Sequence, residues 1–244
     1  MTLLAAERIK LFSTRSPWAC AALAIVLTVG FTALFIGTAD PDKYIAVTHT
    51  QFGYRFGLAV VMVLAALTIT TEYRFGTIRS TFQAVPHRTP ALLAKTAVVS
   101  LTAGIIGLVC AFGAWGLSTL LRPTAGLALD SAQEWRNVAG VGLVFALAAI
   151  ISIAVGIMIR HTAGAITLLL IEFQLAEPLI WGLGDTGEDI HKWLPFNVAN
   201  RFLIGSSEPS TQPELAGWWA LAYFAGIAAV LLTTAIMTAK RRDA

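Results

Sequence analysis

The segment that decides the fold is TTEYRFGTIRSTFQAVPHRTP, residues 70–90, which separates two long hydrophobic runs. Within it Phe75, Ile78, Phe82 and Val85 recur at spacings of three and four residues, which places them on one face of an α-helix. The proline after Val85 lacks a backbone N–H, so we expect this helix to end there. A short helix with an apolar stripe between two membrane spans must cover that stripe, either on lipid headgroups or in a groove on another protein.

The composition indicates a membrane protein. The 244 residues are 57% hydrophobic, with a mean hydropathy of +0.73, and only 13% are charged. Soluble domains carry about 25% charged residues. Each long apolar run reaches the roughly 20 residues that a transmembrane helix needs. We therefore predict an all-α polytopic protein with one transmembrane domain over residues 1–244. Its six transmembrane helices are expected at residues 18–36, 54–71, 96–121, 138–159, 162–181 and 215–239.

The segments outside these spans predict three further features. Residues 2–12 mix apolar and charged side chains, which fits an N-terminal amphipathic helix on the membrane surface; a poorly ordered tail is the alternative. Gly76 would let the chain bend where it leaves the second span. Residues 193–204, WLPFNVANRFLI, are apolar enough to enter the membrane surface between the fifth and sixth spans.

The distribution of charge predicts the orientation. Six spans place both termini on one side, and eleven of the 17 Lys and Arg residues fall on that side, together with the 70–90 segment. Most acidic residues fall on the other side. By the positive-inside rule, both termini and His87 are cytoplasmic, while Asp42, Asp130 and Asp189 are external.

Residues 72–81 carry a resemblance to a known family. Their pattern, Glu-Tyr-Arg-x-Gly-Thr-Ile-Arg-x-Thr after a second span, is similar to that of ABC-2 type permeases, the membrane subunits of ATP-driven transporters with a type V exporter-like fold. The pattern of spans resembles the family over the whole chain, but only this segment is motif-like. The resemblance implies that the helix over residues 75–85 is a cytoplasmic coupling helix that docks on a separate ATPase subunit. The residues that would contact that subunit are Glu72, Arg74, Phe75, Ile78, Arg79 and Phe82.

The same resemblance implies partners and a location. Two ATPase subunits would bind ATP and Mg, and a second permease subunit, identical or homologous, would complete a path for a small-molecule, peptide or lipid substrate. The complex would be an exporter in the bacterial inner membrane, with short external helices between the fifth and sixth spans of each permease. The chain has no GxxxxGK[ST] segment or catalytic motif of its own, so we expect no cofactor in it and no enzyme activity from it alone. Neither a metal site nor a nucleic-acid partner has support from the residue spacing.

Three carboxylates stand out as candidate functional groups. Glu72 could cap the coupling helix or pair with Arg74 or Arg79. Glu172 and Glu177 lie within the fifth predicted span, where a charge must face a protein interior or a water-filled cavity, so both are candidates for the translocation path.

The alternative for Glu172 and Glu177 is structural. Each could be protonated or hydrogen-bonded near Pro178, which would free a carbonyl and end the helix. We favour the functional interpretation for Glu172 and the structural one for Glu177, with Arg55 as a possible partner.

Two other classes of protein fit the same pattern of spans. One is a membrane scaffold or immunity-type subunit that binds an ATPase but transports nothing. The other is a secondary transporter or channel that works without an ATPase. An ATPase partner would exclude the second class, and ATP-dependent movement of a substrate would exclude the first.

Overall fold

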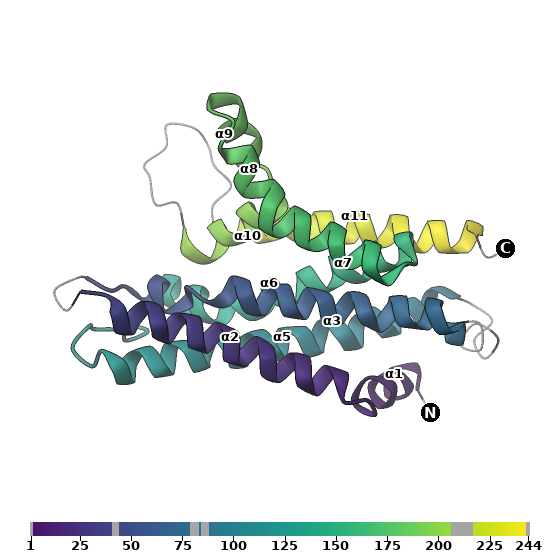
Figure 1. Ribbon diagram of the computed structural model, residues 1–244, viewed down its shortest axis with the longest axis horizontal. Helices are drawn as coiled ribbons and strands as arrows, with labels where there is room; N and C mark the ends of the chain where they lie inside the picture. The colour runs from purple at the N-terminus through teal and green to yellow at the C-terminus, as the bar shows by residue number, and fades with distance from the viewer. Residues whose placement is uncertain (1, 41–43, 79–82, 84–87, 206–216, 243–244) are drawn as a thin grey trace.

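The computed structural model describes residues 2–40, 44–78, 83, 88–205 and 217–242, and its regular structure there is helical (Figure 1). In chain order the elements are α1 (Leu3–Phe12), α2 (Ser16–Thr38), a 3-10 turn (Val47–Gln51), α3 (Tyr54–Phe75), α5 (Arg88–Leu121), α6 (Ala132–Ile159), α7 (Thr162–Ile171), a π-helical turn (Glu172–Ala176), α8 (Glu177–Trp181), α9 (Asp185–His191), α10 (Pro195–Ile204) and α11 (Trp218–Arg242).

Five of these helices are long and apolar enough to cross a membrane, within the part of the chain that is described: α2, α3, α5, α6 and α11. They coincide with five of the six predicted spans and confirm an all-α, membrane-protein-like architecture. The stretch predicted as the fifth span is also helical, but it is divided into α7, the π turn and α8, and its apolar portion ends at Ala176. Its passage through a membrane stays a prediction.

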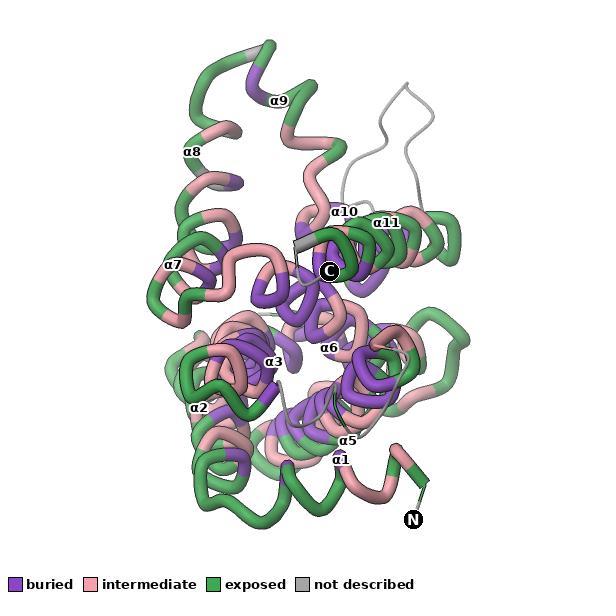
Figure 2. Tube along the Cα trace, turned by 90° about the vertical axis from the view of Figure 1, so that its right-hand side faces the viewer, coloured by how far each residue is buried: buried purple, intermediate pink, exposed green. Residues whose placement is uncertain are grey.

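The core of the bundle is centred on α6, which packs against α3, α5 and α11. Figure 2 shows the buried residues of these helices turned toward one another. Phe145 of α6 is fully buried, and a Cβ atom at Gly107 of α5 would lie 2.7 Å from its ring. Glycine at position 107 therefore leaves the space that the Phe145 ring occupies between the two helices, as small residues do in membrane bundles.

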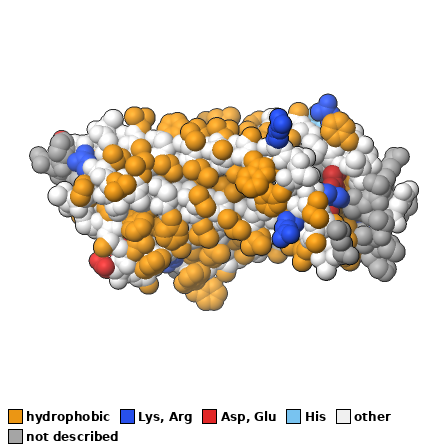
Figure 3. Space-filling model, turned by 90° about the horizontal axis from the view of Figure 1, so that it is seen from below, with side chains coloured by type: hydrophobic (Ala, Val, Ile, Leu, Met, Phe, Trp, Pro, Cys, Tyr) orange, Lys and Arg blue, Asp and Glu red, His pale blue; other side chains and the backbone are white. Residues whose placement is uncertain are grey.

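The outer surface of the bundle is apolar. Leu101, Val26 and Val230 are each at least 65% exposed, and hydrophobic side chains cover the middle of the face seen in Figure 3. Such a continuous apolar surface is costly in water but not in lipid, so it supports placement in a bilayer.

Both ends of the described chain lie at the same end of the bundle as the C-terminal end of α3 (Figure 1). An even number of membrane crossings requires this arrangement. Which side of the membrane this end occupies stays a prediction from the charge distribution.

The structure has short helices where the sequence predicts them, but their positions on or outside a membrane surface stay predictions. The N-terminal segment forms a helix, α1, whose Leu11 is buried against the bundle, so it is not a disordered tail. α9 and α10 lie between the fifth and sixth predicted spans, and α8 and α9 project away from the bundle (Figures 1 and 2). Gly76 has φ +71, in the left-handed region, which confirms the predicted bend after α3.

Candidate functional site

The end of α3 presents an aromatic side chain to the surroundings. α3 ends at Phe75 because the next residue, Gly76, has the left-handed conformation that glycine adopts without strain. The Phe75 side chain is 72% exposed, and the guanidinium carbon of Arg74 lies 5.5 Å from the centre of its ring. An exposed aromatic ring beside an arginine has the composition of a protein-binding surface.

Ile78 does not belong to that surface. It is only 6% exposed and is part of the hydrophobic core. Our prediction of one continuous apolar helix face containing both Phe75 and Ile78 is wrong, because Gly76 ends α3 between them and turns the chain. Arg79 and Phe82, the other two expected contacts of the coupling helix, lie outside the described residues.

A basic hollow of about 710 Å³ lies beside the end of α3. Arg74 lines one side, and the turn between α6 and α7 lines the other with Arg160, His161 and Thr162. The guanidinium carbon of Arg160 lies 4.8 Å from the centre of the Tyr73 ring. The described residues that line the hollow include arginines and no carboxylate, so it is suited to a carboxylate or phosphate group.

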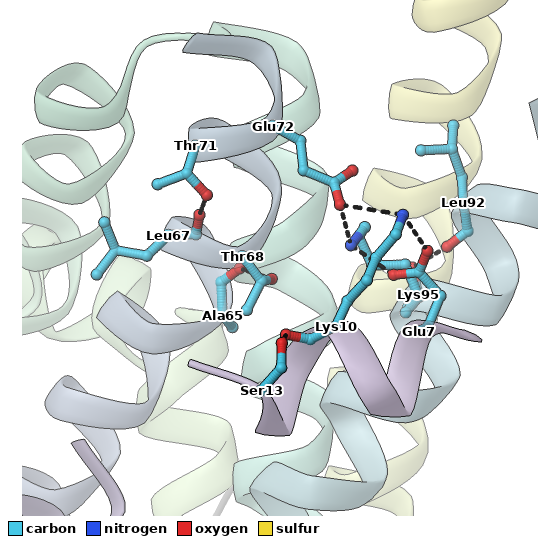
Figure 4. A network of polar contacts seen from close by, with 11 residues as sticks. Glu7, Lys10, Ser13, Ala65, Leu67, Thr68, Thr71, Glu72, Leu92 and Lys95 are labelled. Carbon is cyan, nitrogen blue, oxygen red and sulfur yellow. Dashed lines mark hydrogen bonds and ion pairs between the residues drawn. The ribbon is translucent and has the colours of Figure 1, made fainter. Parts of the chain in front are cut away.

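Glu72 belongs to a cluster of four charges, which we call the four-charge cluster: Glu7 and Lys10 of α1, Glu72 of α3 and Lys95 of α5 (Figure 4). The Lys95 ammonium lies 2.6 Å from Glu7 Oε2 and 3.0 Å from Glu72 Oε1. The Lys10 ammonium lies 3.0 Å from Glu7 Oε1 and 3.5 Å from Glu72 Oε1. The side chains of Glu7 and Lys95 are each 7% exposed, so this cluster joins three helices through largely desolvated ion pairs.

The predicted roles of Glu72 as a helix cap and as a partner of Arg74 do not match this position. Glu72 lies in the last turn of α3 and pairs across the bundle, so it does not cap a helix that begins after Gly76. Its ion-pair partners among the described residues are Lys10 and Lys95 rather than Arg74, and Arg79 lies outside these residues.

The cluster shifts the protonation equilibria of α1. Burial alone would raise the pKa of Glu7, but the charge of Lys95 and hydrogen bonds from Lys95 and Lys10 outweigh it and hold that pKa below its ordinary value. Burial likewise would lower the pKa of Lys10, but its hydrogen bond to Glu7 and the charges of Glu72 and Glu7 raise it. Both shifts favour the charged forms, as expected for a paired cluster.

The fifth predicted span is organised by the π turn and by Arg55 of α3. The N–H of Glu177 donates to the carbonyl of Glu172, five residues earlier. The next carbonyl in this pattern, that of Phe173, would accept a hydrogen bond from the N–H of residue 178, but Pro178 has no N–H. Arg55 supplies the missing donor, because its Nη2 donates to the Phe173 carbonyl oxygen at 3.1 Å. The guanidinium carbon of Arg55 also lies 4.6 Å from the centre of the Phe173 ring. The helix does not end at Pro178, as we expected, but continues through α8.

Glu177 stabilises the N-terminus of α10. Its Oε1 accepts hydrogen bonds from the backbone N–H groups of Phe196 at 2.9 Å and Asn197 at 3.3 Å. The residue preceding α10 is Leu194, whose side chain cannot cap a helix, so the distant Glu177 supplies the acceptor. Glu177 is 2% exposed and, among the described contacts, forms no ion pair with Arg55. These contacts agree with the structural alternative for Glu177.

Glu172 differs from Glu177 in its surroundings. It opens the π turn, is only partly buried, and its carboxylate forms no hydrogen bond or ion pair with another residue in the described part of the chain. π turns often occur at functional positions in helices. Glu172 therefore remains the candidate for the translocation path.

Sequence reasoning missed Glu7 and Lys95, which form the most buried ion pair of the four-charge cluster. A signal was present: Lys95 stands in the apolar stretch ALLAKTAVV, and a charge in such surroundings needs a partner. The partner is 88 positions away in the chain, so only the packing of α1 against α5 identifies it.

Comparison with protein-family models and with curated proteins finds no match to this chain.

Proposed function

We propose that this chain is the transmembrane permease subunit of an ATP-driven exporter resembling the ABC-2 type. Two separate ATPase subunits bind ATP and Mg and hydrolyse the ATP. A second permease subunit, identical or homologous, completes the substrate path. The segment after α3 transmits the ATPase cycle to the membrane helices, and the chain itself performs no chemistry. The complex lies in the bacterial inner membrane with both termini of this chain in the cytoplasm.

The observation that carries the proposal is the exposure of Phe75 at the start of the motif-like segment. Phe75 is 72% exposed at the end of α3, the same end of the bundle where the described chain begins and ends. A large aromatic side chain that the bundle leaves uncovered is typical of an interaction site.

Charge at the same place supports a protein partner. Arg74 lies against the Phe75 ring and also lines the basic hollow together with Arg160. An aromatic anchor flanked by arginines suits a partner surface that offers an apolar pocket with carboxylates around it. A lipid headgroup region would also accommodate an exposed phenylalanine, and the experiments below separate the two partners.

The roles within the site divide as follows. Phe75 anchors the ATPase subunit, and Arg74 orients it. Ile78 holds the segment to the permease rather than to the ATPase. Glu172 lines the substrate path, while Glu177 supports α10 at the end of the same helical stretch.

Purification of the tagged chain from its native membrane tests the first part of this proposal. We expect a P-loop ATPase subunit to copurify in a one-to-one ratio with the permease, and the complex to hydrolyse ATP. Inside-out vesicles that contain the complex should then accumulate a compound from a cell extract only when ATP is present. If no ATPase subunit copurifies, the chain belongs to the secondary-transporter or channel class. If an ATPase subunit copurifies but no compound accumulates in an ATP-dependent way, the chain belongs to the scaffold class.

Substitutions at Glu172 test the substrate path. Glu172→Gln keeps the shape and removes the charge, so the complex should assemble while transport or substrate-stimulated ATP hydrolysis changes. Glu188→Gln, at an exposed position of α9, is the matched control and should have no effect. Full transport activity in a well-folded Glu172→Leu variant would remove Glu172 from the path.

A further inference from the structure

The basic hollow beside the end of α3 gathers hydrogen-bond donors from three parts of the chain. Arg74 comes from α3, Arg160 and His161 come from the turn after α6, and Ala163 comes from the first turn of α7. Phe75, the proposed ATPase anchor, is not among the lining residues. With a volume of about 710 Å³ and two guanidinium groups in its wall, the hollow suits an anionic ligand.

Arg160 has an unusual backbone conformation at the wall of this hollow. Among the described residues other than glycine, it alone has a positive φ, +56, in the left-handed region that glycine adopts without strain. Its guanidinium carbon lies 4.8 Å from the centre of the Tyr73 ring, so the ring helps to hold the charge in place. Strained residues of this kind cluster at ligand-binding sites.

The start of α7 adds donors that carry no full charge. His161 caps this helix, because its Nδ1 accepts a hydrogen bond from the N–H of Gly164 at 3.1 Å. A ring nitrogen that accepts this bond carries no proton, so the neutral imidazole has its donor on Nε2. The N–H groups of Thr162 and Ala163, in the first turn, have no acceptor within the helix. An anion here would also meet the positive end of the helix dipole.

The surface next to the hollow becomes apolar along α7. Ile166 lines the hollow about 6 Å of helix rise beyond Thr162, and Leu170 follows Ile166 on the same face. Elsewhere on α7, Leu168 and Ile171 are 52% and 47% exposed. Because α7 begins beside the end of α3 and runs back along the bundle toward α8 (Figure 1), these residues lie deeper than the arginines. An anionic head with acyl chains matches both parts of this surface, whereas a soluble anion or a protein carboxylate matches only the first.

We propose that the basic hollow binds the phosphate of an anionic phospholipid such as phosphatidylglycerol. The phosphate oxygens accept hydrogen bonds from the guanidinium groups of Arg74 and Arg160 and from the Nε2–H of His161. The acyl chains extend over Ile166 and along α7. Phosphatidylethanolamine is a poorer ligand, because the ammonium group next to its phosphate lies beside two guanidinium groups and is repelled by them.

Native mass spectrometry of the purified chain, with equal amounts of dioleoyl-phosphatidylglycerol and dioleoyl-phosphatidylethanolamine, measures this preference directly. We expect the glycerol lipid to be retained on the order of tenfold more, since each basic residue near an anionic lipid contributes about fivefold. Glycerophosphoglycerol, the same headgroup without acyl chains, presents the same phosphate chemistry in soluble form and should not displace the lipid.

Two substitutions lower the positive charge of the hollow without straining the fold. Arg160→Gly removes a guanidinium group where glycine adopts the backbone freely, so the protein should stay folded while the preference falls about fivefold. Ala163→Glu places a carboxylate in the first turn of α7, where the helix dipole favours it, and should reduce the preference to about one. Two controls should keep the wild-type preference: Ala163→Gln, which adds no charge, and Arg8→Gln, which removes an exposed arginine of α1 outside the hollow.

Equal retention of the two lipids by the wild-type chain would overturn the proposal and leave the hollow to an acidic protein partner. An equal fall of the preference in Arg8→Gln and Arg160→Gly would also overturn it, because surface charge in general would then explain the preference. Displacement by glycerophosphoglycerol would identify a soluble phosphate ester as the ligand, and a preference unchanged in Ala163→Glu would place the lipid elsewhere. All of these measurements use the isolated chain, so none depends on whether it binds an ATPase.

Discussion

Arg55 of α3 donates a hydrogen bond from Nη2 to the carbonyl oxygen of Phe173 at 3.1 Å, where Pro178 leaves that carbonyl without a backbone donor. A side chain from one predicted span therefore completes the backbone hydrogen bonding of another. In a membrane, where water cannot substitute, an unsatisfied carbonyl is especially costly. The contact explains how the helical stretch from α7 to α8 continues past a proline.

The link between Arg55 and Pro178 can be tested with a double-mutant cycle. Arg55→Leu should lower the free energy of unfolding by about 1.5–3 kcal/mol, because it removes a hydrogen bond from a charged donor. In a Pro178→Ala background the alanine N–H can bond the carbonyl, so the same substitution should cost about 1 kcal/mol less. Denaturation of the detergent-solubilised protein measures both. Strictly additive effects would show that Arg55 does not compensate for the proline.

Lys95 should be among the most sensitive charged positions. Lys95→Met leaves Glu7 and Glu72 with only Lys10 as partner in the described structure, and removing one member of a buried pair typically costs about 3–5 kcal/mol. Lys192→Met is the matched control, because Lys192 forms an ion pair with the exposed Asp189 at 2.9 Å and should contribute about 0–1 kcal/mol. Thermal unfolding, monitored by tryptophan fluorescence, compares the stability of the two variants. Equal losses of stability in the two variants would show that burial does not make the Lys95 ion pairs more important than the exposed one.

The four-charge cluster also predicts how stability depends on pH. The pKa of Glu7 is lowered from 4.5, so the contribution of this carboxylate is complete above pH 4.5 and is lost as the pH falls through the lower, folded-state pKa. The pKa of Lys10 is raised from 10.5, so its contribution is complete below pH 10.5 and is lost as the pH rises through the higher folded-state pKa. The melting temperature at a series of pH values measures both.

Single substitutions assign the two limbs of that pH profile. Glu7→Gln should flatten the acid limb and leave the alkaline limb smaller but present, because Lys10 keeps Glu72 as a partner. Lys10→Met should act mainly on the alkaline limb. If the melting temperature of Glu7→Gln falls at low pH as much as that of the wild-type chain, the loss of stability at low pH comes from other carboxylates.

The orientation of the bundle is open to direct labelling. In a chain whose Cys20 and Cys110 are replaced by alanine, cysteines at the exposed positions Asp130 and Asp189 should react with a membrane-impermeant maleimide in intact cells. A cysteine at Ser13, exposed at the opposite end of the bundle, should react only after the cells are opened. The reverse pattern would place the termini outside and contradict the charge distribution.

The long helices could be predicted from the sequence because apolar runs set them directly. The helices extend beyond the predicted spans where polar residues continue them: α6 begins at Ala132 instead of residue 138, since Ser131 and Glu134 form a capping box there. α5 similarly begins at Arg88 instead of residue 96.

The candidate site could be predicted only in part, because its key contacts join distant segments. Hydrophobic periodicity continues from Phe75 to Ile78 as though no bend intervened, although Gly76 separates their environments. Pro178 predicts the end of a helix, and only the approach of α3 supplies the donor that lets the helix continue. The partners of Glu72 follow from the packing of α1 and α5, which no local pattern reports.

Phe75 and Ile78 should therefore respond in opposite ways to truncation. Phe75→Ala removes an exposed side chain, so the stability of the isolated permease should change by no more than about 0.5 kcal/mol. If Phe75 anchors the ATPase, the same substitution should weaken assembly by on the order of 2 kcal/mol, a roughly 30-fold rise in the dissociation constant. Ile78→Ala should instead cost about 2–5 kcal/mol of stability, because Ile78 is buried in the permease itself.

A matched control separates this effect from a general loss of exposed aromatic surface. Tyr44 is 80% exposed but precedes α3, at the opposite end of the bundle, so Tyr44→Ala should leave ATPase binding unchanged. Copurification of the ATPase subunit at increasing salt would compare the variants. The loss of binding caused by Arg74→Ala should shrink as salt rises, because screening also weakens the wild-type charge interaction, whereas the loss caused by Phe75→Ala should persist. A Phe75→Ala variant that binds the ATPase as well as the wild-type chain does would assign the exposed ring to the lipid surface, since the bundle itself leaves it uncovered.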